Sequence, residues 1–165
     1  MHPIDWLCAK APEFKELPEE DRLAIMHFSL LCSFFESEVL NTNASAAAIL
    51  GIVHEWAAQG RLGVAAFQES LSYFKGRYFT DGAETPHLKG LKLRKNDSPS
   101  LVEGILRGEN TNSADSVSAL LIIVYRLRNN LFHGAKWAYG IRGQLGNFTH
   151  ANNALMSALE IHSQL

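Results

Sequence analysis

Apolar residues recur along most of the chain at the three- and four-residue spacing of amphipathic helices, and the alternation typical of strands is absent. The pattern predicts an all-α helical bundle of about six to seven helices. The expected helices are residues 4–10, one that opens at 17–20, one that ends at Gly60, 63–78, 98–106, one capped by Asn112 or Ser113, and one from 148 or 149 to 163. A glycine-punctuated linker over 134–146 precedes the last helix.

The helix that opens at 17–20 is expected to be the central helix of the bundle. Pro18 suits a first turn, and Glu19 and Glu20 place carboxylates against the positive end of the helix dipole. Its apolar residues form two adjoining stripes that cover more than half of its circumference. The first stripe holds Leu23, Met26, Leu30 and Phe34, and the second holds Phe28, Leu31, Phe35 and Val39.

Polar residues and glycines mark several helix ends. Asn43 or Ser45 can cap the third helix, because their side-chain oxygens accept from free backbone N–H groups. Ser100 and Glu103 have the spacing of a capping box at the start of the fifth helix. Gly108 is expected to end that helix.

Periodicity fails over residues 79–97, which we expect to be a loop inside the domain rather than a domain boundary. Gly82, Pro86 and Gly90 interrupt it. It also gathers positive charge within nine residues, at His87, Lys89, Lys92, Arg94 and Lys95. Such a run is either a solvated surface or a contact for RNA or a partner protein, and the sequence leaves both open.

Length and composition are those of one domain over residues 1–165. The chain is 47% hydrophobic and 10% aromatic, which is enough to bury a sizeable core. Its formal net charge of -2 argues against a general nucleic-acid coat, because such affinity comes from many Lys and Arg residues on phosphates. Any contact with RNA is therefore expected to be local.

The cysteines and histidines indicate reduced thiols and no metal site. Cys8 and Cys32 are the two cysteines, and they form no C-x-x-C pair. No histidine stands at a convincing ligand spacing with carboxylates or thiols, so neither a metal nor a cofactor is expected. The N-terminus lacks a targeting pattern and no apolar run has the length of a membrane span, so we expect a cytoplasmic protein.

The most informative stretch is Tyr125-Arg126-Leu127-Arg128-Asn129-Asn130-Leu131-Phe132-His133-Gly134, which ends an apolar helix in strongly polar residues. Cleaving RNA without a metal requires a group that takes the 2′-hydroxyl proton, a group that protonates the leaving 5′-oxygen and a fixed cation. Histidine exchanges protons near neutral pH, and arginine offers a planar fork that fits two phosphate oxygens. Arg128 and His133 are therefore candidate catalytic residues, with Asn129 as a polar companion.

The spacing of Arg128 and His133 limits what a single helix can do with them. Five residues at about 100° each put the two side chains roughly 140° apart on an ideal helix. They converge only if the helix ends or bends between them, or if a second chain completes the site. Arg126 and Lys136 are expected to be solvated, although both lie close enough in sequence to add phosphate-binding charge for RNA.

This stretch, read as Arg128-x4-His133 with Asn129 after the arginine, resembles the signature of the HEPN superfamily of small all-helical domains. Residues 73–78 and 91–97 resemble an uncharacterised branch of that group, so the likeness extends over roughly residues 20–163. The resemblance implies a HEPN-like bundle and a metal-independent endoribonuclease of toxin–antitoxin or phage-defence type. It also implies a homodimer whose two protomers pool their Arg–His pairs in one cleft, and an antitoxin such as a minimal nucleotidyltransferase.

The stretch departs from family patterns in two ways. Members that are silenced by modification carry a tyrosine two residues after the histidine, and this chain has Ala135 there. Other members carry an acidic residue five positions before the arginine and a lysine directly before it, and this chain has Ile123 and Leu127 at those positions. The resemblance therefore does not imply silencing through a tyrosine at that position.

The alternative is a non-catalytic nucleotide- or protein-binding module in which the motif is structural. The side chains of Arg128, Asn129, Asn130 and His133 could satisfy carbonyls at the helix end and tie it to a neighbouring helix. Glu36 or Glu38 of the second helix could accept from the arginine. Of these two, Glu36 is the better candidate to orient a cation, because it follows two phenylalanines on a mostly apolar helix.

Overall fold

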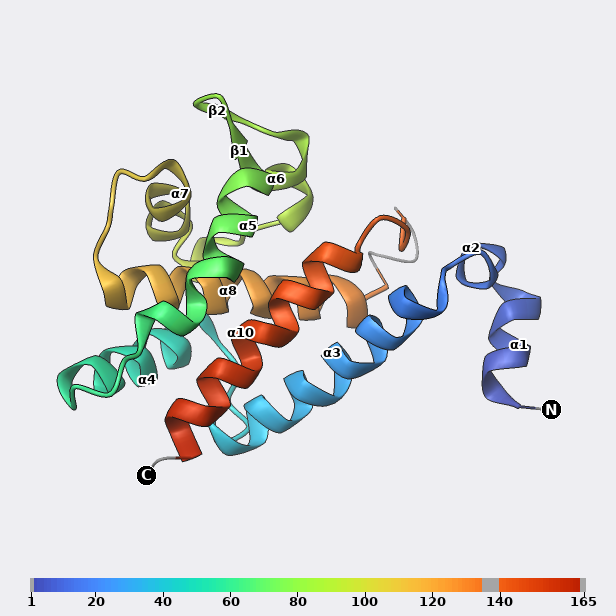
Figure 1. The fold of residues 1–165 in the computed structure, drawn as a ribbon, viewed down its shortest axis with the longest axis horizontal. Coiled ribbons are helices and arrows are strands. Elements are labelled where there is room, and N and C mark those ends of the chain that lie inside the picture. Colours follow the sequence, from blue (N-terminus) through green and yellow to red (C-terminus); the bar gives the residue numbers. More distant parts are fainter. Residues whose placement is uncertain (1, 135–139, 164–165) are drawn as a thin grey trace.

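The protein is an all-α helical bundle, as the hydrophobic pattern predicts. The computed structural model describes residues 2–134 and 140–163, and these residues form nine α-helices, two 3₁₀ helices and one hairpin (Figure 1). In chain order the elements are α1 (Pro3–Lys10), α2 (Pro12–Lys15), α3 (Glu19–Glu38), α4 (Ala46–Ala58), η1 (Val64–Phe67), α5 (Gln68–Tyr78), β1 (Phe79–Thr80), β2 (Ala83–Glu84), α6 (Pro86–Leu91), η2 (Lys95–Asp97), α7 (Pro99–Arg107), α8 (Ser113–Phe132) and α10 (Leu145–Ser163). The predicted six to seven helices omit α2 and α6, which are too short to show a hydrophobic period.

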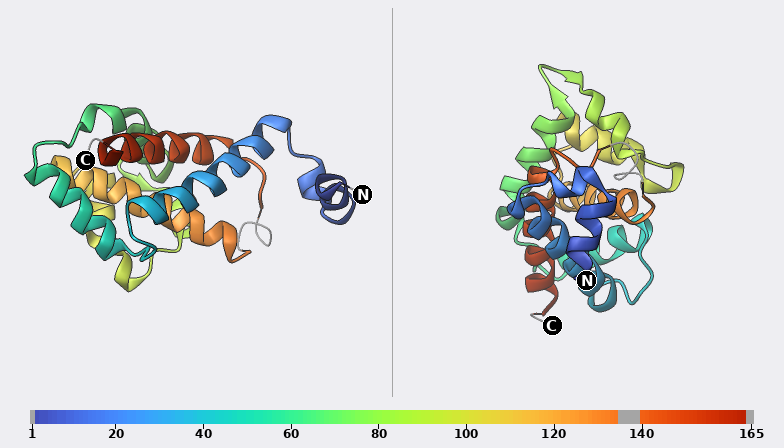
Figure 2. Two further views of the ribbon diagram at one scale, coloured as in Figure 1. Left: turned by 90° about the horizontal axis from the view of Figure 1, so that it is seen from below. Right: turned by 90° about the vertical axis from the view of Figure 1, so that its right-hand side faces the viewer.

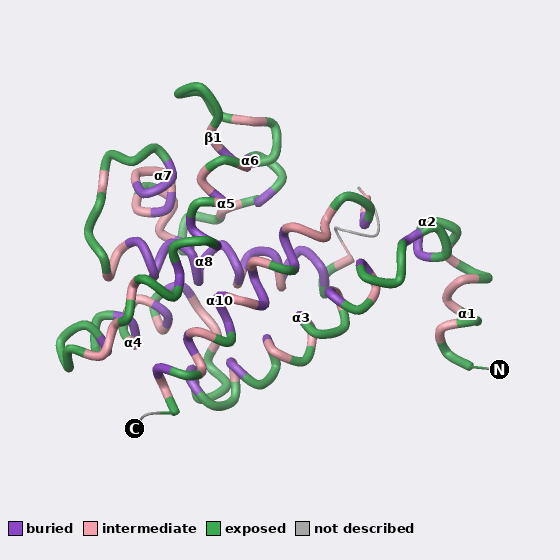
Figure 3. Tube along the Cα trace, viewed as in Figure 1, coloured by how far each residue is buried: buried purple, intermediate pink, exposed green. Residues whose placement is uncertain are grey.

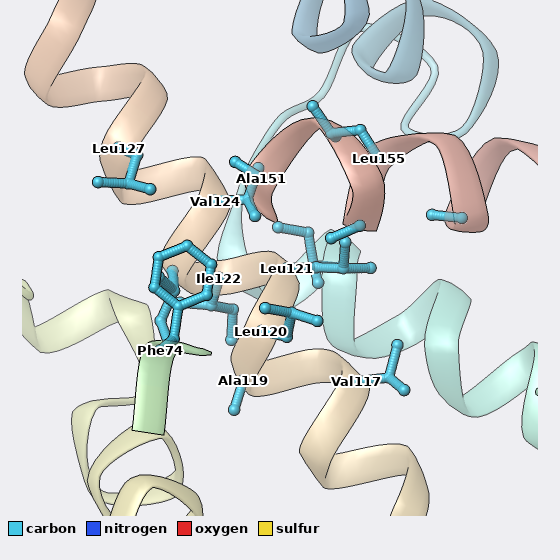
Figure 4. Close-up of a cluster of buried hydrophobic side chains, with 14 of the residues drawn as sticks. Phe74, Val117, Ala119, Leu120, Leu121, Ile122, Val124, Leu127, Ala151 and Leu155 are labelled. Carbon is cyan, nitrogen blue, oxygen red and sulfur yellow. The ribbon is translucent and has the colours of Figure 1, made fainter. Parts of the chain in front are cut away.

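Helix α8 is the centre of the bundle. Fourteen of its 20 residues are buried, on all sides of the helix. Helices α4, α5, α7 and α10 pack around it, and side chains such as Phe74 of α5 and Leu155 of α10 gather against it (Figure 4). A helix that is apolar all round is the one that a core surrounds.

Helix α3 lies at the surface instead, and the prediction that it is central is wrong. It packs along α10 through its second stripe, where Phe28 meets Phe148 with ring centroids 5.0 Å apart. The Asn152 side-chain amide of α10 donates to the Ala24 carbonyl at 3.2 Å. The first stripe is exposed to solvent, and much of the α3 trace has the colour of exposed residues in Figure 3. Its four members are Leu23, Met26, Leu30 and Phe34, and Leu30 is 69% exposed.

Two of the expected N-caps are present. Ser45 accepts from the Ala48 N–H at 3.1 Å and begins α4, and Asn112 accepts from the Asp115 N–H at 3.0 Å and begins α8. Gly108 ends α7 with a φ of 76°, a left-handed conformation that costs glycine little. These local signals placed both helix starts correctly.

The expected capping box of the fifth helix is wrong. Helix α7 already begins at Pro99, after Ser98 in the left-handed region, so Ser100 lies within the helix. Glu103 pairs instead with Arg107 one turn later, at 3.4 Å. The proline at the first helical position sets the start of this helix.

The segment 79–97 is more structured than the loop that we expected. Strands β1 and β2 form an antiparallel hairpin across Asp81 and Gly82, which both have positive φ, and α6 and η2 follow. Two-residue Asp-Gly turns are a strong hairpin signal, so the sequence did contain this information. Thr85 donates its hydroxyl to the Arg77 carbonyl at 2.6 Å and thereby fixes the hairpin and α6 beside α5.

Helix α10 begins at Leu145, three to four residues before the expected start. Because Gly146 continues the series of glycines before it, the sequence pattern assigned the first turn of α10 to the linker. A Cβ on Gly146 would lie 2.5 Å from the Tyr73 hydroxyl oxygen, so the glycine allows Tyr73 to pack against this turn. The phenol also donates to the Asn147 side-chain carbonyl at 3.2 Å.

The N-terminal helices form a small second cluster at one end of the molecule (Figure 2). Phe14 and Leu17 are buried in one cluster with Ile141, which lies just before α10. An ion pair between Glu16 and Arg142 joins the same two segments. Within residues 2–134 and 140–163, no helix has both the length and the apolar character needed to cross a bilayer.

Candidate functional site

Arg128 is held by a two-pronged ion pair from α8 to α3. Its Nε lies 2.8 Å from Glu36 Oε1, and its Nη2 donates to Glu36 Oε2 at 3.0 Å. Nη1 donates to the Asn129 side-chain oxygen at 3.0 Å, and the guanidinium carbon stands 5.2 Å from the ring centroid of Phe132. Glu36 thus occupies the orienting position that the sequence suggested, and its fixed geometry matches the planar guanidinium.

This arrangement leaves part of Arg128 open to solvent. Each Nη nitrogen carries two N–H groups and uses one of them in its hydrogen bond to Asn129 or Glu36, so a second N–H remains on each. The Arg128 side chain is 30% exposed and that of Glu36 is 21% exposed. The guanidinium is therefore both fixed in direction and accessible from one side.

The crevice behind the ion pair is too small to hold a ligand. It has a volume of about 10 Å³ and is lined by Cys32, Glu36 and Arg128 among others. Burial raises the pKa of the Cys32 thiol, and the Glu36 carboxylate raises it further while Arg128 opposes the shift. Cys32 is therefore a protonated core thiol, and any substrate of Arg128 has to approach from the outer surface.

Asn129 and Asn130 are both buried, and they serve different contacts. Asn129 accepts from Arg128, as described above, and is 6% exposed. Asn130 donates to the carbonyls of Gly90 and Leu91, at 3.4 and 3.1 Å, and so ties α8 to the end of α6. The polar end of α8 therefore has a structural role on one side and presents Arg128 on the other.

His133 is the C-cap residue of α8 and has an exposed position. Its backbone N–H donates to the Asn129 carbonyl, which closes the last turn. Gly134 follows with a φ of 74°, so the helix ends where the sequence suggested. His133 therefore stands at the helix end, one to two turns beyond Arg128.

Arg126 is buried rather than solvated, so the expectation of an exposed RNA-binding side chain is wrong. It is 3% exposed, and its Nε lies 3.4 Å from Asp97 Oδ2, which is also buried. The angle does not make this contact a hydrogen bond, but two buried opposite charges at this distance attract strongly. Burial lowers the pKa of Arg126, and Asp97 opposes the shift. Lys136, the other expected RNA contact, lies outside the described residues.

The basic run after the hairpin divides into two groups. Arg94 and Lys95 line a surface hollow above the Arg126–Asp97 pair. His87, Lys89 and Lys92 face a larger cavity beside α6. Sequence reasoning singled out this run but not the residues from other elements that complete the cavity, because the hydrophobic pattern gives no relative placement of helices.

Two further observations bear on the kind of site. In the described part of the chain, no three His, Cys, Asp or Glu side chains are placed to hold a metal ion. Comparison with protein-family models, with curated proteins and with solved structures gives no match to this chain.

Proposed function

We propose that the protein is a metal-independent endoribonuclease of the HEPN type, with a composite Arg–His site in the cleft of a homodimer. The observation that carries the proposal is the end of α8, where a guanidinium aimed by a carboxylate is followed by an exposed imidazole. A buried tie between helices would not need two donors open to solvent. A phosphate-binding cation does.

The proposed roles follow from the chemistry of each group. Neutral His133 takes the proton from the ribose 2′-hydroxyl as its oxygen bonds to phosphorus. Arg128 holds the negative charge of the phosphorane, and Asn129 and Glu36 keep its fork in place. The bond to the 5′-oxygen then breaks, and His133 of the second copy, in its protonated form, donates to that oxygen. The products are a 2′,3′-cyclic phosphate and a 5′-hydroxyl.

A second copy of the chain would bring together Arg128 and His133 side chains that point in different directions on one helix. The two side chains leave a regular helix about 140° apart, and no ligand-sized cavity lies behind Arg128. Exposed apolar side chains stand on both helices of the site, Leu30 and Phe34 on α3 and Phe132 on α8. Covering each such side chain stabilises an interface by up to about 1.5–3 kcal/mol. This face is where we place the dimer.

The proposal also covers the cellular role of the enzyme. An active ribonuclease of this kind acts in the cytoplasm as a toxin or in phage defence, and needs an inhibitor there. A minimal nucleotidyltransferase or another antitoxin is the expected partner. Co-expression with the product of a neighbouring gene tests this, because a cognate antitoxin should relieve growth inhibition by the parent protein.

The test of the reaction combines cleavage and stability. Purified protein should cut RNA in EDTA, leave a 2′,3′-cyclic phosphate and spare DNA of the same sequence, which lacks the 2′-hydroxyl. Arg128→Lys and His133→Ala should lose cleavage and keep the parent melting temperature within a few degrees. Matched controls are Arg107→Lys and His54→Ala, which change exposed residues elsewhere in the fold and should cut normally.

Two outcomes would reject the ribonuclease. One is cleavage that survives both substitutions. The other is an intact dimer that cuts no RNA substrate. Light scattering that shows only monomer at micromolar concentration would reject the shared cleft specifically.

A non-catalytic binding module remains the second candidate. The observation that favours it is that both Nη nitrogens of Arg128 already donate hydrogen bonds, one to Asn129 and one to Glu36, which is also how a structural tie between α3 and α8 would look. In that case Arg128→Lys should lower the melting temperature by several degrees without any effect on RNA. The stability measurement therefore separates the two functions.

A further inference from the structure

A second and larger cavity lies on the opposite side of α8 from Glu36. It has a volume of about 570 Å³, within the range of small-molecule sites. Its walls come from α5, α6, the C-terminal part of α8 and the start of α10. In Figure 1, α5 and α6 lie on one side of α8, and α10 packs against α5.

The lining of this cavity is strongly basic. Arg77, His87, Lys89 and Lys92 contribute to it, and none of the described lining residues is an aspartate or glutamate. Three residues with constant positive charge, Arg77, Lys89 and Lys92, therefore line one hollow in a chain whose formal net charge is -2. Such a concentration of one sign focuses the electrostatic field on an anion.

Arg77 and Lys89 are the residues on which the argument rests. They come from different helices, α5 and α6, and Thr85 holds these helices together through its bond to the Arg77 carbonyl. No ion pair joins either side chain to a carboxylate within the described ranges 2–134 and 140–163. Their charges are thus not neutralised by the protein there.

Buried amides make the cavity wall rigid. Asn147 is 1% exposed, accepts from the Tyr73 hydroxyl at 3.2 Å and donates to the Gln144 side chain at 2.7 Å. Asn130 is 5% exposed and is fixed by the carbonyls at the end of α6. A polar wall that is held in this way binds a ligand without first having to be ordered.

The start of α10 adds to the positive potential. Gln144 and Asn147 flank the first turn of this 19-residue helix, and both line the cavity. The free N–H groups and the dipole of a helix N-terminus favour negative charge within the first turn. Two independent features, the basic side chains and the helix end, thus act on the same hollow.

From this arrangement we propose that the cavity binds the phosphate group of a small phosphomonoester. Arg77 and Lys89 contact the phosphate oxygens, and the remaining volume takes the organic part of the ligand. The site is separate from Arg128, which lines a different crevice. Helix α8 contributes Leu127 and Asn130 to the lining of the cavity. The proposal therefore stands whether or not the protein is a ribonuclease.

Calorimetric titration with ribose 5-phosphate at low ionic strength tests the proposal, with ribose as the matched neutral probe. The parent protein should bind the phosphate ester and not the sugar. Arg77→Gln and Lys89→Gln should each weaken binding at least about tenfold, since each removes a charged partner of the phosphate. Lys10→Gln makes the same change in net charge on the exposed face of α1 and should bind like the parent.

The outcomes separate this site from the proposed nuclease site. Arg128→Lys should bind ribose 5-phosphate normally, and Arg77→Gln should keep any RNA cleavage. No binding by the parent, equal binding of ribose, or unchanged binding by both cavity variants overturns the proposal. Arg77-dependent binding of a 5′-phosphorylated RNA without binding of ribose 5-phosphate also overturns it, because the cavity would then serve the RNA chain.

Discussion

The buried ion pair between Arg126 and Asp97 offers the sharpest test of the structure, through the substitution Arg126→Met. Methionine keeps most of the aliphatic length of arginine and removes the charge. Asp97 is 5% exposed in the parent protein, and its side chain accepts from the Arg94 backbone N–H at 2.7 Å. Losing one member of a buried pair costs about 3–5 kcal/mol, because the other charge is left without compensation.

We therefore expect Arg126→Met to lose about 3–5 kcal/mol at pH 7. For a domain of this size the loss corresponds to a drop in Tm of roughly 6–20 °C.

Urea unfolding followed by circular dichroism measures the loss, and a double-mutant cycle locates its cause. Asp97→Asn combined with Arg126→Met removes both charges and should recover at least half of the stability. The control is Lys95→Met on the same surface hollow, which should change stability by less than about 0.5 kcal/mol. If Arg126→Met costs under about 1 kcal/mol, the pair behaves as a surface contact and the buried placement of Arg126 is refuted.

Three further predictions concern other parts of the fold. In the native protein iodoacetamide should label half-buried Cys8 well before Cys32, whose pKa is raised by burial, and mass spectrometry showing equal labelling would contradict the packing of α3. Leu30→Ser should leave the melting temperature of the isolated chain within about 2 °C, because the side chain is exposed, while it weakens the proposed dimer in sedimentation experiments. Gly146→Ala should destabilise the protein by about 1–3 kcal/mol in urea, since its methyl group would meet Tyr73, and a gain in stability would mean that helix propensity outweighs this contact.

The sequence by itself determined the helical class and the order of the main helices. The spacing of apolar residues found seven of the helices, and Ser45, Asn112 and Gly108 marked their ends correctly. These features depend on neighbours within one turn, where side-chain chemistry acts directly on the backbone. The same locality made Arg128 and His133 stand out at the end of α8.

Only the tertiary structure decided which apolar face is covered and which charges are paired. The two stripes of α3 look alike in the sequence, yet Phe28 is buried and Leu30 is exposed. Arg126 and Arg128 are two residues apart, and the helix turns one toward Asp97 and the other toward Glu36. Both outcomes depend on contacts between segments far apart in the chain, and burial on such contacts is set by the whole packing arrangement rather than by local propensity.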